Sequence, residues 1–205
     1  MTAGQYWDAR YRAAPVERLS WFEPTATMSL GFLDALGVDP TDSVIDVGGG
    51  VSPLAGDLLE RGFGDVTVLD VSAAALDTAA RRLPHPNRVR WVAADVRTWQ
   101  PEGTWRVWHD RAVFHFLTTD DDRGAYLETM ARSLAPGGGL VIATFALDGP
   151  ERCSGLPVQR YDAQTLLATV SSHLEAELVT EARHVRCTPA GAQQPFTWIA
   201  CRRQP

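Results

Sequence analysis

Three short apolar segments of the chain each contain or precede a carboxylate, and the first of them is also followed by a run of glycines. Asp46 lies in the first segment and is followed by the glycine run at residues 48–50. Asp70 ends the second segment, and Asp95 lies just beyond the third. Glycine has no Cβ, so such a run lets the backbone turn sharply and approach a ligand closely. The carboxyl ends of parallel strands line one crevice, so these residues are expected to share a ligand site.

The residues around the glycine run distinguish between two kinds of ligand. A glycine-rich turn can bind the pyrophosphate of a dinucleotide, but in the spacing G-x-G-x-x-G counted from Gly48 the third position is Pro53. Asp46 would also place a negative charge beside the pyrophosphate. S-adenosylmethionine (SAM) carries a sulfonium and an ammonium cation, so the charges favour SAM. Two alternatives involve no ligand: the glycine turn could be purely structural, and Asp95 could serve only as a helix cap.

The segment 108–117 follows the fourth apolar segment and contains Asp110 and His115. In methyl transfer the protein aligns the acceptor and, where needed, removes a proton. Imidazole titrates near neutral pH, so His115 is a candidate general base. The alternatives are a core histidine between Phe114 and Phe116, and a turn cap at Asp110. The residues expected to act in catalysis are His115 and Asp110.

Aromatic side chains are dense in the first 22 residues, and polar ones occur after residue 150. Cations are attracted to ring faces, so Trp21 is expected to shield the sulfonium; packing within a helical cap is the alternative. Arg160 could bind an anionic or polar acceptor or form only a surface ion pair. The side chains expected to contact the acceptor are Tyr6, Tyr11, Phe22, Arg160 and Tyr161.

The elements that position these residues alternate between strand-length apolar segments and segments of helical period, which predicts a parallel sheet with right-handed crossovers. Strands are expected over residues 43–47, 66–70, 89–93, 106–109 and 140–145. Helices are expected over residues 53–60, 72–83, 122–135 and 162–171, with a turn after 134. The two strand-like stretches at 174–186 and 196–202 predict a terminal antiparallel hairpin.

Composition excludes several classes of function. The 205 residues are 45% hydrophobic and 21% charged, which is typical of a globular domain. A net charge of −6 argues against nucleic-acid binding. No apolar run reaches the ~18 residues of a membrane span. Three cysteines without metal-site spacing favour reduced thiols and no metal. There is no lysine, and alanine, arginine and glycine are abundant. We therefore expect a cytoplasmic, bacterial protein without Schiff-base or P-loop chemistry.

These motifs resemble those of the class I SAM-dependent methyltransferases. The segment from Asp46 to Gly50 matches the family's glycine motif, Asp70 its ribose-binding acid and Asp95 its adenine-side acid. The stretch from Leu134 to Gly138 matches the turn before its fifth strand. Gly49 differs, because many members have Cys, Ser or Thr there. The start Tyr-Trp-Asp-x-Arg-Tyr is similar to that of elongation-factor and citrate-synthase lysine methyltransferases, and also to that of small-molecule members.

The resemblance implies an α/β, Rossmann-like, seven-stranded, mostly parallel sheet with an antiparallel last strand and helices on both faces. We expect one domain over 1–205, with a helical cap at 1–40, a SAM-binding core at 41–147 and an acceptor-side loop, helix and hairpin at 148–205. The expected function is methyl transfer from SAM to a small molecule. A protein-lysine methyltransferase and a non-catalytic SAM-binding module are the alternatives. The expected cofactor-binding residues are Asp46, Gly48, Gly49, Gly50, Asp70, Val71, Asp95, Val96, Asp110 and Trp21.

Overall fold

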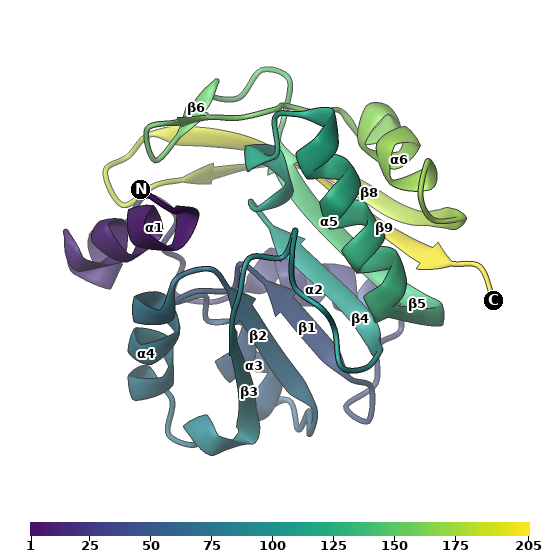
Figure 1. The fold of residues 1–205 in the computed structure, drawn as a ribbon, viewed down its shortest axis with the longest axis horizontal. Helices are drawn as coiled ribbons and strands as arrows, with labels where there is room; N and C mark the ends of the chain where they lie inside the picture. Colours follow the sequence, from purple (N-terminus) through teal and green to yellow (C-terminus); the bar gives the residue numbers. More distant parts are fainter.

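Seven strands form one sheet in the computed structural model, which describes residues 1–205 (Figure 1). The strand order is β3-β2-β1-β4-β5-β9-β8, and only β9 runs antiparallel to its neighbours among these pairings. The strands are β1 (Val44–Val47), β2 (Val66–Asp70), β3 (Val89–Ala93), β4 (Trp105–Arg111), β5 (Leu134–Phe145), β8 (Ala176–Cys187) and β9 (Gln193–Arg203). This topology confirms the predicted mostly parallel sheet with an antiparallel last strand.

Helices cover both faces of the sheet, with α5 and α6 in front and α2 and α3 behind in Figure 1. The strand residues alternate between two apolar clusters, one on each face, so that β1 and β2 are buried throughout. This double burial explains their continuous apolar sequences. The helices are α1 (Ala3–Arg12), α2 (Thr27–Ala35), α3 (Leu54–Glu60), α4 (Ala73–Arg82), α5 (Asp120–Ser133) and α6 (Ala163–Ser171), with short 3₁₀ turns η1 (Val16–Arg18), η2 (Pro86–Arg88) and η3 (Phe114–Phe116). None of them combines the length and apolarity needed to cross a bilayer.

Two expectations about local structure are wrong. The predicted turn after Leu134 belongs to β5, because Leu134 already pairs with Trp105 of β4 and the register shifts before the next pair. Gly137 takes a left-handed φ of 67° within this irregular start. The stretch after residue 150, expected as a loop, contains a two-stranded ribbon of β6 (Arg152–Cys153) and β7 (Leu156–Pro157).

Helix α1 lies beside α4 and near β6 (Figure 1). Its Asp8 carboxylate accepts hydrogen bonds from the Ser72 hydroxyl at 2.6 Å and from the Ala74 backbone N–H at 3.2 Å, at the N-terminus of α4. At the other side Tyr6 donates to the backbone carbonyl of Ser154 in the β6–β7 turn. Helix α1 is therefore held between the N-terminus of α4, which follows β2, and the β6–β7 turn, which follows β5.

Candidate functional site

A cavity of about 260 Å³ lies at the carboxyl ends of β1, β2, β3 and β4. Its remaining walls come from α1, the segment that contains Trp21, and the β6–β7 ribbon. Ligands bind at this edge of parallel sheets, so the cavity is the candidate functional site. The expected residues that line it are Tyr11, Trp21, Phe22, Gly48, Gly49, Asp70, Val71, Asp95 and Val96.

The glycine turn after β1 forms one wall of the cavity. Gly48 has a φ of 66°, and a Cβ there would lie 1.9 Å from a Val113 methyl group. A Cβ on Gly49 would lie 2.5 Å from Oδ2 of Asp46 and 2.8 Å from Val68. Side chains are therefore excluded at both positions, and the backbone itself faces the cavity. Gly50 does not line the cavity, because the Tyr11 hydroxyl occupies the space where its side chain would extend.

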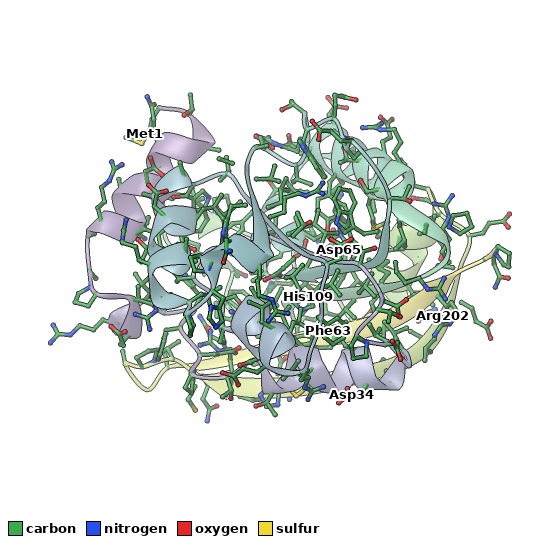
Figure 2. All side chains as sticks on the ribbon, turned by 90° about the horizontal axis from the view of Figure 1, so that it is seen from below. Met1, Asp34, Phe63, Asp65, His109 and Arg202 are labelled. Carbon is green, nitrogen blue, oxygen red and sulfur yellow. The ribbon has the colours of Figure 1, made fainter.

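Asp46 supports this turn from the interior and does not line the cavity. Its Oδ1 is hydrogen-bonded to Nδ1 of His109 at 2.8 Å, and Nε2 of His109 is 2.9 Å from the Ser29 hydroxyl. All three side chains are buried, and Figure 2 shows His109 in the interior, away from labelled peripheral residues such as Met1. Asp46 and His109 are register neighbours on β1 and β4. His109 was not predicted from the sequence as the partner of Asp46, although the equivalent positions of the two residues on adjacent strands could have indicated the contact.

Asp70 presents its carboxylate to the cavity from the end of β2. One oxygen accepts a hydrogen bond from the Ser72 backbone N–H at 2.8 Å. Burial raises the pKa of Asp70 to about 7, and the negative charge of Asp46 adds to the increase. A carboxylate in this position can accept hydrogen bonds from the hydroxyls of a ligand.

Asp95 lines the cavity with its carboxylate held by Arg97, a partner that was not predicted from the sequence. Nε of Arg97 lies 3.0 Å from Oδ1, and Nη2 lies 2.6 Å from Oδ2. Nη1 of Arg97 bonds Asp122 at 2.6 Å, at the start of α5. The hydrogen bonds from Arg97 lower the pKa of Asp95. Asp95 also accepts from the Arg97 backbone N–H, so it stabilises the local turn as well.

The structure does not bring Asp110 into the cavity, contrary to its expected catalytic and cofactor-binding roles. Its carboxylate is fully buried and accepts hydrogen bonds from the backbone N–H groups of Val113 and Phe114 and from the Tyr126 hydroxyl, at 2.8, 3.0 and 2.6 Å. Burial raises its pKa to about 6. These contacts are those of a turn cap, the alternative to a catalytic role.

His115 also lies outside the cavity. Its ring is fully buried and packs against Phe116 and Phe145, with centroids 4.5 and 4.7 Å apart. Burial lowers its pKa to about 3. The chain bends after β4, where Ala112 adopts a left-handed φ of 74°, and His115 follows this bend. The geometry fits the core-histidine alternative and gives no support to the expected general base.

Aromatic side chains form one wall of the cavity. Trp7 packs edge-to-face against Trp21 and Phe116, with centroid distances of 5.8 and 5.2 Å. Tyr11 lies one helical turn after Trp7 and packs against Trp21 at 5.5 Å. Trp7 and Phe116 were not predicted from the sequence; the spacing of Trp7 and Tyr11 on one face of a helix was a usable signal. Phe22, one of the expected residues, lines the same wall.

Three expected acceptor residues do not line the cavity. Tyr6 is engaged with the Ser154 carbonyl. Arg160 donates to the Gly149 carbonyl at 3.0 Å and pairs with Glu151, which is the surface ion pair that stood as its alternative role. Tyr161 is buried in the core between strand and helix. From the same region, Cys153, Ser154 and Leu156 of the β6–β7 ribbon line the cavity instead.

Two arginines fix the segment that carries Trp21 and Phe22. Nε of Arg186 lies 3.1 Å from one oxygen of Glu23, and Nε of Arg111 lies 3.7 Å from the other. Arg186 also donates to the Phe22 carbonyl, and Arg111 donates to the Trp21 carbonyl. Glu23 and Arg111 both line the cavity. Residue spacing offers no sign of this pairing, because β4, β8 and the segment are far apart along the chain.

Comparisons with known proteins find similarity to methyltransferases. The family described as "Methyltransferase domain" matches residues 44–138. EEF1A lysine methyltransferase 4 from Mus musculus is 30% identical over 183 residues, which cover 82% of this chain and 70% of the relative.

Two solved structures share the fold. The N-methyltransferase NodS from Bradyrhizobium japonicum WM9, in complex with S-adenosyl-L-homocysteine (SAH), has a TM-score of 0.72 at 16% identity and covers 98% of this chain and 100% of its own. The 1,6-didemethyltoxoflavin-N1-methyltransferase from Burkholderia thailandensis, bound to 1,6-didemethyltoxoflavin and SAH, has a TM-score of 0.69 at 22% identity and covers 98% and 84%.

Proposed function

The chain belongs to the class I SAM-dependent methyltransferases, and from that premise we propose that it methylates a small-molecule acceptor bound in the cavity. The observation that carries the proposal is the aromatic wall of the cavity. Trp7 contacts both Trp21 and Phe116 there, and residues of the β6–β7 ribbon line the same cavity. An apolar wall of this kind can exclude water from a small reactant and align it.

The residues that line the cavity suit the chemistry of SAM. At Gly48 and Gly49 the backbone faces the cavity, and Cβ atoms there would collide with Val113, Asp46 and Val68. We propose that this wall receives the methionine part of SAM. We further propose that Asp70 accepts hydrogen bonds from the ribose hydroxyls and that Asp95, held by Arg97, accepts one from the adenine amino group. Val71 and Val96 would contact the adenosine through their apolar side chains.

SAM supplies a methyl group already activated by the positive sulfur. The protein's part in the proposed mechanism is alignment and exclusion of water. The aromatic wall of Trp7, Tyr11 and Trp21 suits a sulfonium, because ring faces attract cations. Asp110 and His115 lie outside the cavity, so we propose that neither removes a proton from the acceptor. Positioning of reactants alone can account for a large share of a rate enhancement.

A protein lysine is the second candidate acceptor. It is favoured by the relative named EEF1A lysine methyltransferase 4, which is 30% identical to this chain. A lysine ammonium group would need an acidic, open rim. The cavity is lined by the guanidinium group of Arg111 together with its partner carboxylate, Glu23, so the preference for a small molecule rests on the aromatic wall and not on this charge. A module that binds SAM without turnover is the third candidate.

The test uses methyl-labelled SAM, the purified protein and a cell extract, which is afterwards separated into protein and low-mass fractions. The small-molecule proposal expects label in the low-mass fraction, and Asp70→Ala as a control should abolish it. Label confined to the protein fraction would refute the proposal in favour of a lysine acceptor. Tight binding of SAH with no label in either fraction would favour the non-catalytic module.

A further inference from the structure

Strand β8 is the longer of the two free edges of the sheet. It ends the strand order, so one side of its twelve residues has no neighbouring strand, whereas the other edge strand, β3, has five residues. Its side chains alternate between half-buried and exposed over nearly the whole length. Two of the exposed ones are apolar, with Val179 at 42% and Val185 at 38% exposure. A long exposed edge can form hydrogen bonds with a further strand.

The backbone groups that face this free edge can be assigned. The N–H of Thr188 donates to the carbonyl of Ala192 across the β8–β9 hairpin at 2.8 Å. Hydrogen-bonded positions recur at every second residue of an antiparallel pair, so the even-numbered residues between the register shift and Thr188 also direct their backbone groups towards β9. Glu181, Arg183 and Val185 therefore direct theirs outwards, where no other segment bonds to them.

The side chains along this edge complement a second copy of themselves. When two antiparallel copies of β8 pair with Ala182 at the two-fold axis, Glu181 of each copy lies opposite Arg183 of the partner subunit. The same register places Val179 opposite Val185 of the partner subunit. Opposite charges and apolar side chains that face each other across two strands stabilise their pairing. Glu181 and Arg183 both direct backbone groups to the free edge, as a hydrogen-bonded pair requires.

Other registers lack this complementarity. A two-fold axis at Glu181 or at Arg183 would place like charges directly opposite each other, which destabilises a strand pair. An axis at His184 or beyond would leave both charges opposite uncharged residues. An axis at Thr180 or before would bring the register shift that follows Leu178 into the centre of the pair. The complementarity is therefore specific for one register.

The contact that Arg183 already makes leaves it available. It pairs with Asp148 of its own chain, and the two side chains are 53% and 61% exposed. Exposed ion pairs contribute little to stability, and a guanidinium group has five N–H donors. Arg183 can therefore bind a second carboxylate beside Asp148. Glu181 is exposed and forms no ion pair within its own chain.

We propose that two copies of this chain associate through β8, in antiparallel pairing centred on Ala182, so that their two seven-stranded sheets become continuous. An interface that uses the same surface on both copies closes at two subunits. The register shift after Leu178 ends the regular edge, so the paired segment is short. The dimer is accordingly weak and forms as the protein concentration rises.

The first experiment follows the mass of the full chain by sedimentation equilibrium from micromolar to millimolar concentration. The mass should rise from one chain to two. Glu181→Arg and Arg183→Glu should each raise the dissociation constant by about ten-fold or more, because each turns two attractions into repulsions. The double variant with both changes should restore the dimer. Glu60→Arg, an equal change of charge at an exposed position of α3, is the control, and circular dichroism verifies folding.

The second experiment tests the register by mild oxidation in a Cys187→Ser background, which removes the exposed thiol of β8. Ala182→Cys should form a disulfide between two copies, because residue 182 faces its own copy across the axis within the span of a disulfide. His184→Cys should not, since each copy of residue 184 lies opposite Thr180 of the partner subunit. Non-reducing electrophoresis distinguishes the two variants.

A protein that remains a single chain at all concentrations would overturn the proposal and would show that the charges and the register shift protect the edge from pairing. A dimer that neither charge reversal weakens would place the interface elsewhere. Cross-linking at residue 184 in place of residue 182, or a double variant that stays monomeric, would contradict the register. Growth beyond two subunits would contradict the two-fold axis.

Discussion

Oδ2 of Asp46 lies 2.5 Å from the position that a Cβ on Gly49 would occupy. The buried hydrogen bond between His109 and the other oxygen of Asp46 holds the carboxylate in this orientation. The glycine turn therefore has no room for the Cys, Ser or Thr that many members of the family have at this position. A close contact with Asp46 of the first strand thus restricts the residue type at this wall of the cavity.

Gly49→Ala should destabilise the protein and weaken SAH binding. Its methyl group would also lie 2.8 Å from Val68, so the core must shift, at a cost of about 1–3 kcal/mol. Chemical denaturation and SAH calorimetry measure the two effects. The control is Gly31→Ala, since Gly31 lies within α2 and a Cβ added there would have no atom within 4 Å. Equal stability of the two variants would contradict the prediction.

The affinity for SAH should rise with pH as Asp70 ionises. Its pKa of about 7 in the free protein is raised by burial, whereas an unfolded chain would have a value near 3.8. The ionised carboxylate is the better acceptor for ribose hydroxyls, so binding should strengthen as pH rises through about 7. Calorimetry between acidic and mildly alkaline pH measures this, and Asp70→Asn should bind weakly with a flat profile. A pH-independent affinity in the unmodified protein would refute the assignment.

The titration of Asp70 should also make the folded protein without ligand less stable as pH rises, whereas SAH binding should strengthen. Its folded pKa lies above the unfolded value, so its contribution is fully present below about 3.8 and is lost as pH rises to about 7. Without ligand, Asp70→Asn should therefore gain stability relative to the unmodified protein across this window. Urea denaturation at several pH values measures the difference. A constant difference between the two proteins would show that Asp70 does not titrate abnormally.

His115→Gln should keep its turnover per folded molecule. The side chain lies outside the cavity, and its pKa of about 3 keeps the imidazole neutral at ordinary assay pH. A glutamine still offers an acceptor to the Phe145 N–H, which lies 3.4 Å from Nδ1 of His115. Label transfer from SAM, normalised to folded protein by circular dichroism, is the measurement. Loss of a general base would instead reduce turnover by about 10²–10⁴-fold.

Arg97→Ala should weaken SAH binding through Asp95. The arginine holds both oxygens of Asp95 and ties them to Asp122, so its removal leaves the carboxylate free to rotate. The expected loss in the free energy of SAH binding is about 0.5–1.5 kcal/mol, which is the net contribution of one hydrogen bond. Calorimetry with Arg81→Ala as the control separates this from a general change in charge, since Arg81 is exposed on α4. Equal losses in both variants would contradict a positioning role.

The sequence by itself determined the sheet and the glycine turn that lines the cavity. Short Val-rich segments become strands buried on both faces because their burial follows from local composition and from alternation with helices. Gly48 marks a left-handed turn that other residues rarely adopt. Asp70 ends its strand, so its place at the carboxyl edge follows from the strand itself. These features depend on residues that are neighbours along the chain.

Only the tertiary structure decided which side chains face the cavity. Ala112 adopts a left-handed φ that nothing in its residue type indicates, and His115, which follows this bend, lies in the core. Arg186, on a strand at the far edge of the sheet, reaches the segment of Glu23 from the other end of the chain, a pairing that residue spacing cannot indicate. Trp7 and Tyr11 line the cavity from α1, which the contacts of Asp8 hold at the N-terminus of α4. Long-range contacts set the directions of these side chains, so the lining of the cavity is a property of the packed molecule.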